Sequence, residues 1–119
     1  MLLLVDDEAR ILSALKRVLR REGYTIRLAK DAAGAVAILE SESIDLVVSD
    51  YKMPGASGTE LLAVVRRRWP EIRRILLSGW SREIPESELA MAAPHALHAK
   101  PWDDAELKAA IRDALRDGG

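Results

Sequence analysis

Four short apolar segments of this 119-residue chain each run directly into a polar or charged side chain, and this pattern strongly constrains the fold. Short apolar runs of this kind are typical of buried β-strands. The junctions are Val5 into Asp6-Asp7, Ser49 into Asp50, Leu77 into Ser78 and Ala99 into Lys100. In a parallel α/β sheet the carboxyl ends of the strands share one edge, where ligands bind. We therefore expect three carboxylates, one hydroxyl and one ammonium in a single pocket.

Strand-like and helix-like segments alternate five times along the chain. Residues 11–19 have apolar side chains at helical spacing, and Gly23 ends that helix. Apolar and polar side chains then alternate over residues 24–28, as they do in a half-exposed edge strand. Residues 46–48 are apolar on both faces and are therefore expected at the centre of a covered sheet. Further helices are expected over residues 32–40, from a Ser57/Glu60 capping box to Pro70, over 88–93, and after Asp103. This alternation predicts an α/β fold with a parallel sheet and helices on both faces.

The length fits one domain, residues 1–119, and the composition excludes several classes of site. Apolar residues make up 49% and charged residues 31%, with a formal net charge of −1, which gives no general surface for nucleic acid or anionic membrane. The absence of cysteine excludes disulfides and thiolate zinc sites, and two histidines cannot form a three-histidine metal site. Met1 to Val5 is too short for a signal peptide and no segment has transmembrane length, so the expected compartment is the cytoplasm.

Five arginines lie close together at residues 66–68 and 73–74. A phosphate-binding patch is one interpretation of such a cluster. The mixed charge of the rest of the sequence favours another, in which the cluster is the solvated end of a helix and the start of the strand beyond it.

The segments at the strand ends, taken in order and spacing, resemble the receiver domain of bacterial two-component response regulators over nearly all 119 residues. They are Val5-Asp6-Asp7-Glu8, residues 49–55, Leu77-Ser78-Gly79 and Lys100-Pro101-Trp102. The resemblance implies a doubly wound, flavodoxin-like three-layer sandwich with five parallel strands in the order 2-1-3-4-5. It also implies a phosphoacceptor signalling domain, whose only catalysis is its own phosphorylation and slow autodephosphorylation.

Three carboxylates in one cleft repel one another unless a cation joins them. Mg²⁺ is the expected cation because it prefers oxygen ligands and bridges to phosphate, with Mn²⁺ as an alternative. By resemblance, Asp7 and Asp50 bind the metal directly, Asp6 binds it through water, and the backbone carbonyl of Lys52 completes the protein ligands.

A carboxylate can attack phosphorus and form an aspartyl phosphate. Asp50 ends the most buried strand and matches the family's phosphoacceptor, so it is the expected nucleophile toward a phosphohistidine on a sensor histidine kinase or phosphotransfer protein. The resemblance gives Lys100 the role of neutralising charge on the transferred group. It gives Ser78 the role of donating a hydrogen bond from its hydroxyl to a phosphoryl oxygen.

Three further positions have modulating roles in the family. Pro101 follows a cis peptide there, and X-Pro is the bond at which that geometry costs least. Two positions tune loss of the phosphoryl group, and here they are Lys52 and Trp80. A bulky indole beside the acyl phosphate should obstruct attacking water, so we expect Trp80→Ala to lose the group faster than the parent.

One position departs from the family pattern. Tyr or Phe usually stands three residues before the lysine and turns inward when the hydroxyl moves, but this chain has Leu97. Leucine offers no large ring to bury, so the output is expected to use another route, with His98 or Trp80 as candidates.

Simpler interpretations remain for single residues, since Asp6-Asp7 is also a good helix cap and Asp50 and Ser78 also suit turns. A phosphohydrolase with an aspartate nucleophile commonly has a second acid two residues later, where this chain has Lys52. A nucleotide-binding domain lacks support because no glycine-rich loop follows the first strand. The main alternative is a receiver-like interaction module that is never phosphorylated.

The chain is expected to be either a stand-alone receiver or the front of a longer regulator with an output domain. The segment Lys100-Pro101-Trp102-Asp103-Asp104 resembles receivers fused to cyclic-dinucleotide phosphodiesterase domains. A homodimer that forms on phosphorylation is a further expectation.

Overall fold

The computed structural model describes residues 1–79 and 84–117. The predictions for Trp80 and for Gly118-Gly119 therefore lie outside the described residues. Within the described part of the chain, every helix is too short or too polar to span a bilayer.

Strand and helix alternate along the described chain in the expected order. The strands are β1 (Leu2–Val5), β2 (Ile26–Ala29), β3 (Leu46–Asp50), β4 (Arg73–Ser78) and β5 (Ala96–Ala99). The helices are α1 (Ala9–Arg20), α2 (Ala32–Ser41), α3 (Gly58–Arg68), α4 (Glu86–Ala92) and α5 (Asp104–Asp117).

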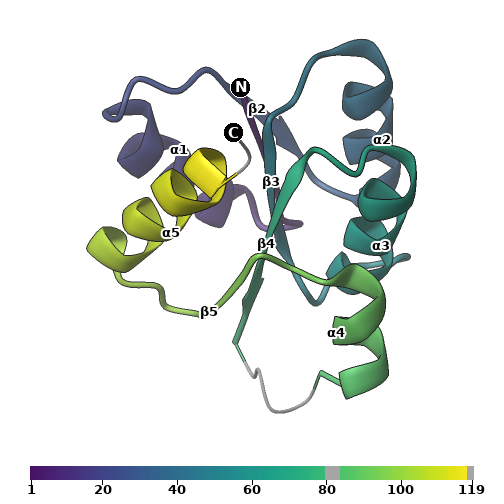
Figure 1. The fold of residues 1–119 in the computed structure, drawn as a ribbon. Helices are drawn as coiled ribbons and strands as arrows, with labels where there is room; N and C mark the ends of the chain where they lie inside the picture. Colours follow the sequence, from purple (N-terminus) through teal and green to yellow (C-terminus); the bar gives the residue numbers. More distant parts are fainter. Residues whose placement is uncertain (80–83, 118–119) are drawn as a thin grey trace.

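All four strand pairings are parallel and the order is β2-β1-β3-β4-β5, which confirms the predicted topology. Helices α1 and α5 cover one face of the sheet, and α2, α3 and α4 cover the other (Figure 1). Each face has its own apolar core, one with Leu15, Leu46 and Ile111 and the other with Val47, Leu61 and Leu76. Because β3 lies in the middle and is buried throughout, its last residue, Asp50, is held on a rigid strand.

The predicted helix caps are present. The Asp31 carboxylate accepts a hydrogen bond from the Gly34 amide at 2.7 Å, and the Asp103 carboxylate accepts one from the Glu106 amide at 2.9 Å. Ser57 forms the capping box at the start of α3. These caps satisfy backbone groups that would otherwise lack partners, which is why local sequence located the helix starts.

β2 is a half-exposed strand at the edge of the sheet, as predicted, with Leu28 exposed and Ala29 buried. One predicted surface assignment was wrong. In β4, Arg74 is 6% exposed instead of solvated. Arg74 lies two residues from Ile72 and two from Leu76, and alternate strand residues share a face, so it enters the core that contains α3 and α4.

Candidate functional site

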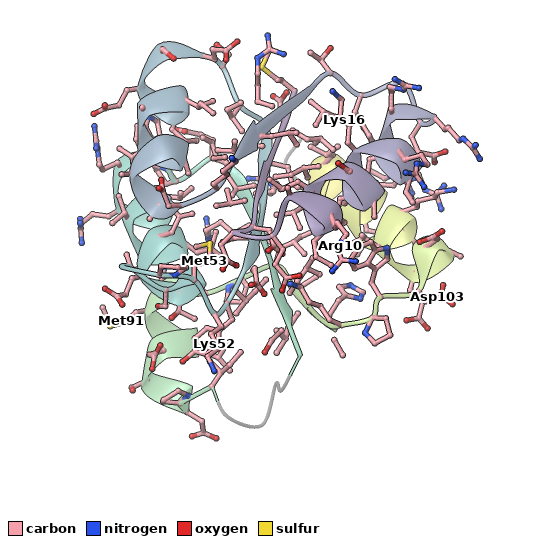
Figure 2. All side chains as sticks on the ribbon, turned by 180° about the vertical axis from the view of Figure 1, so that it is seen from behind. Arg10, Lys16, Lys52, Met53, Met91 and Asp103 are labelled. Atoms are coloured by element: carbon pink, nitrogen blue, oxygen red, sulfur yellow. The ribbon has the colours of Figure 1, made fainter. Side chains whose placement is uncertain are left out.

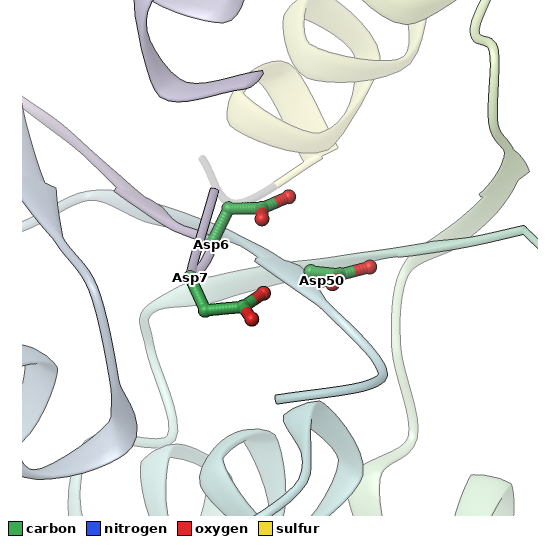
Figure 3. Close-up of side chains that lie close together, drawn as sticks. All are labelled: Asp6, Asp7 and Asp50. Carbon is green, nitrogen blue, oxygen red and sulfur yellow. The ribbon is translucent and has the colours of Figure 1, made fainter. Parts of the chain in front are cut away.

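The carboxyl ends of β1 and β3 bring the three predicted carboxylates together. Asp6 and Asp7 follow β1, Asp50 ends β3, and one carboxylate oxygen from each lies within 4.8 Å of the others. Their side chains point to the same side of the sheet edge (Figure 3). Asp6 is fully buried and Asp50 is 7% exposed, whereas Asp7 is exposed. The site is therefore a buried pair of acids with a third at its open rim.

The Lys100 ammonium joins the two buried acids. Its Nζ lies 2.7 Å from Oδ2 of Asp6 and 3.0 Å from Oδ1 of Asp50. The lysine reaches this position because β5 pairs with β4, and the Lys100 amide donates to the Ser78 carbonyl at 2.9 Å. The Lys100–Pro101 peptide is cis, as the resemblance implied. The other Asp6 oxygen accepts a hydrogen bond from the Glu8 amide at 2.9 Å.

The charges at this site are incompletely balanced. Burial raises the pKa of Asp50, and the nearby carboxylates of Asp6 and Asp7 raise it further, while the hydrogen bond from Lys100 opposes them. Burial alone would lower the pKa of Lys100, but its hydrogen bonds to Asp6 and Asp50 outweigh that effect and raise it. Lys100 pairs with two of the three clustered acids, so the cluster keeps an excess of negative charge that favours an additional cation.

The residues present fit a magnesium ion. All three side chains offer the carboxylate oxygens that Mg²⁺ prefers. The exposed side chain of Asp7 leaves one side of the cluster open to solvent, and Mg²⁺ usually keeps several of its waters. The three carboxylates outnumber the single Lys100 ammonium that lies among them.

Gly58 supports the backbone of Asp50 from the start of α3. Its amide donates to the Tyr51 carbonyl at 2.8 Å. A Cβ atom at position 58 would lie 2.1 Å from the Asp50 carbonyl oxygen, far inside contact distance. Only glycine therefore lets α3 begin this close to the strand end, and the sequence prediction did not include it.

The other predicted site residues differ in how far they are exposed to solvent. Ser78 ends β4 and is 3% exposed, while Lys52 is exposed on the loop after β3 (Figure 2). Leu97, in β5, pairs with Leu76 of β4 and is 38% exposed. Pro101 is exposed beside Lys100.

An apolar groove of about 690 Å³ borders the site on the α1 side. Ile11 and Val18 of α1 form one wall, and Lys100, Pro101 and Trp102 form the other. The groove therefore ends at the lysine that binds the two acids.

Two other residues beside the centre were missed in the sequence. Tyr51 follows Asp50, and its hydroxyl donates to Oε1 of Glu88, on α4, at 3.2 Å. No periodicity or short motif links positions 37 residues apart, so this contact had no local signal.

Comparison with known proteins identifies the family. The profile of the response regulator receiver domain matches residues 2–112. The chain belongs to the response regulator receiver domain family. It is 36% identical over 118 residues to the hydrogenase transcriptional regulatory protein HoxA of Cupriavidus necator, covering 98% of this chain and 24% of that protein. The receiver domain spans about a quarter of the length of the first curated relatives it matches.

Solved structures agree with this assignment. The signal receiver domain of an HD domain-containing protein from Pseudomonas fluorescens Pf-5 has a TM-score of 0.90 and 36% identity, with 98% of this chain and 94% of that chain covered. The response regulator TrrA from Thermotoga maritima, solved in complex with Mg(2+)-BeF, has a TM-score of 0.87 and 31% identity, with 95% and 96% covered. Both likenesses extend over the whole sheet and therefore include the strand ends that form the site.

Proposed function

We propose that this receiver domain accepts a phosphoryl group onto Asp50 from a phosphohistidine of a sensor histidine kinase or phosphotransfer protein. The observation that supports the proposal is the convergence of Asp50 with Asp6, Asp7 and Lys100 at one edge of the sheet. A relative with 31% identity binds Mg(2+)-BeF, and a beryllium fluoride group has the charge and tetrahedral shape of a phosphoryl group.

The transfer forms an O–P bond to a carboxylate oxygen of Asp50 as the P–N bond to the kinase imidazole breaks. The electron pair of the broken bond stays with the imidazole, which takes up a proton from solvent. Asp50 suits this role because a buried strand fixes it and Lys100 holds one of its oxygens at 3.0 Å. Fixing the nucleophile lowers the entropic part of the barrier.

Asp7 and Asp50 would bind a magnesium ion directly and Asp6 through water, with the Lys52 carbonyl as a further ligand and Mn²⁺ as an alternative ion. Such an ion would neutralise negative charge on the transferring group. Lys100 contributes an ammonium to the same neutralisation, and the Ser78 hydroxyl donates to a phosphoryl oxygen. By the sequence resemblance, the indole of Trp80 would obstruct attacking water, so Trp80→Ala is expected to dephosphorylate faster.

The receiver domain, residues 1–119, acts within a two-component pathway, where its phosphorylation state controls an output domain or target protein. HoxA of Cupriavidus necator and GlrR of Escherichia coli are about four times its length, and both are named as transcriptional regulatory proteins. The proposed output is a change in the affinity of this domain for such a partner or for a second copy of itself.

The test is incubation with Mg²⁺ and a small-molecule acyl phosphate, followed by intact-protein mass spectrometry. We expect a gain of one phosphoryl group that disappears in Asp50→Asn and without Mg²⁺. Asp45→Asn, a change at an exposed acid before β3, is the matched control and should be phosphorylated like the parent. No gain in the parent would contradict the proposal and favour an interaction module that is not phosphorylated.

A further inference from the structure

One carboxylate on α4 binds both segments that flank the proposed phosphoacceptor. Oε1 of Glu88 accepts a hydrogen bond from the Thr59 hydroxyl at 2.7 Å and one from the Tyr51 hydroxyl at 3.2 Å. Thr59 is 2% exposed and lies in the first turn of α3, and Tyr51 is half-buried on the loop after β3. Three segments therefore meet at a single, partly buried oxygen atom.

Both donors are linked to Asp50 through the backbone, Tyr51 directly and Thr59 through Gly58, whose amide donates to the Tyr51 carbonyl. Gly58 also packs so closely on Asp50 that an added Cβ atom would lie 2.1 Å from the Asp50 carbonyl oxygen. The loop after β3 and the start of α3 are therefore packed together, and a displacement of the Asp50 backbone has a direct path to both hydroxyls.

The other end of α4 is held by two arginines, one on α3 and one on β4. The Arg66 guanidinium donates to the carbonyls of Ala90 and Met91, and the buried Arg74 guanidinium donates to those of Ala92 and Ala93. These bonds fix the last turn of the helix against α3 and β4. Glu88 lies in the first turn of α4, which these arginine bonds do not reach.

The outer surface of α4 is suited to present such a movement to a partner. Met91 lies on its outer side and is 62% exposed (Figure 2). Leu97 on the neighbouring β5 is also partly exposed and carries no polar atom that could exchange hydrogen bonds. Among the described contacts, the hydrogen bonds of Glu88 with the Tyr51 and Thr59 hydroxyls connect the segments next to Asp50 with α4.

We propose that Glu88 couples the state of Asp50 to the position of α4 through the hydroxyls of Tyr51 and Thr59. The inference rests on the proposed function, since it takes modification of Asp50 as the input. Coupling between two sites is reciprocal, so loosening α4 must also change how tightly the phosphoacceptor site binds a phosphoryl-like anion. Couplings of this kind typically change an affinity by about 5-fold or more.

The first measurement is hydrogen exchange of the α4 amides, with and without Mg²⁺ and beryllium fluoride. In the parent, ligand addition should change exchange in residues 86–92 by about 5-fold or more. The change should be lost in Glu88→Ala and strongly reduced in Tyr51→Phe and Thr59→Val. The matched controls are Glu86→Ala, on the same helix turn, and Tyr24→Phe, the other tyrosine of the chain. Both controls should respond like the parent.

A double-mutant cycle separates coupling from a general loss of packing. Tyr51→Phe and Glu88→Ala remove the same bond, so the double variant should have the same beryllium fluoride affinity as Glu88→Ala alone, not the product of two losses. Circular dichroism and thermal unfolding confirm that each variant is folded.

The outcomes distinguish the two proposals. If the parent gains a phosphoryl group on Asp50 but α4 responds equally in the parent and in Glu88→Ala, the coupling is wrong while the phosphoacceptor assignment stands. If α4 of the phosphorylated parent does not respond at all, the coupling is also wrong. If the parent binds neither phosphoryl group nor beryllium fluoride, both fail.

Discussion

Among the described residues of this receiver domain, charged side chains are buried at two places, and their charge is compensated differently. At the carboxyl edge of the sheet, Asp6 and Asp50 share the Lys100 ammonium, with Asp7 nearby. At the C-terminal end of α4, the Arg74 guanidinium donates three hydrogen bonds to the carbonyls of Ile72, Ala92 and Ala93. The first place brings like charges together, and the second surrounds one charge with dipoles.

The difference separates a site built for a ligand from one built for the fold. The carbonyls at a helix C-terminus carry partial negative charge, so Arg74 compensates them without a counter-ion. Burial lowers the pKa of Arg74, and the neighbouring Arg66 and Arg73 lower it further. Three acids around one lysine leave negative charge that a cation can neutralise. We therefore expect bound cations to raise the stability of the fold through the acidic cluster. Substitution should lower the stability most at Arg74.

The largest expected effect is that of Arg74→Met. Methionine can fill the space but donates no hydrogen bond, so three carbonyls lose a charged partner. Bonds from charged donors are worth about 1.5–3 kcal/mol each, and water replaces part of them, which gives a loss of about 3 kcal/mol in the free energy of unfolding. Urea denaturation measures it, with the exposed Arg67→Met as control, expected within about 0.5 kcal/mol of the parent. A loss as small as that of the control would show that the guanidinium is not needed.

The next effect is stabilisation by Mg²⁺. An ion that binds only the folded state at 100 times its dissociation constant adds roughly 2.7 kcal/mol to the free energy of unfolding. For a chain of this size that raises the melting temperature by several degrees. Thermal unfolding with and without Mg²⁺ should show the rise in the parent and in Arg67→Met, but not in Asp7→Asn. An equal rise in Asp7→Asn would place the ion elsewhere.

A smaller gain in stability is expected for Asp50→Asn without metal. The pKa of Asp50 is raised in the folded state, so its contribution to stability is present at low pH and is lost as pH rises through the folded-state pKa. At neutral pH the charged form therefore destabilises the metal-free fold. Asparagine removes that charge, and we expect a gain of about 1 kcal/mol in urea denaturation at pH 7 that disappears at low pH. A variant less stable than the parent at pH 7 would contradict the charge imbalance.

The smallest effect is expected at the end of α4. Ala93 has a φ of 42° at the position after the helix, a left-handed conformation that suits glycine better than alanine. Ala93→Gly should therefore stabilise the fold by about 0.5 kcal/mol, while Ala90→Gly, inside the helix, should destabilise it by about 1 kcal/mol. Thermal unfolding of the two variants tests the contrast, and a loss of stability in Ala93→Gly would show that unfolded-state entropy outweighs the relief.

The sequence predicted features whose causes are local or periodic. Helix starts followed from Asp31, Ser57 and Asp103, because a cap and the amides it binds are within three residues. The convergence of Asp6, Asp50 and Lys100 followed from topology, since parallel strands end at one edge. The burial of Arg74 could also have been predicted, because Ile72 and Leu76, two residues away on either side, are both in the core. The arginine cluster around it suggested solvent instead.

Only the tertiary structure decided which groups touch. Lys100 binds Asp6 and Asp50 together because strand register and the turn into Pro101 fix where its ammonium ends, and none of these is encoded within one segment. Likewise, the meeting of Glu88 with Tyr51 depends on how α4 packs against α3. Local sequence sets backbone preferences over a few residues, whereas such contacts depend on the packing of whole elements.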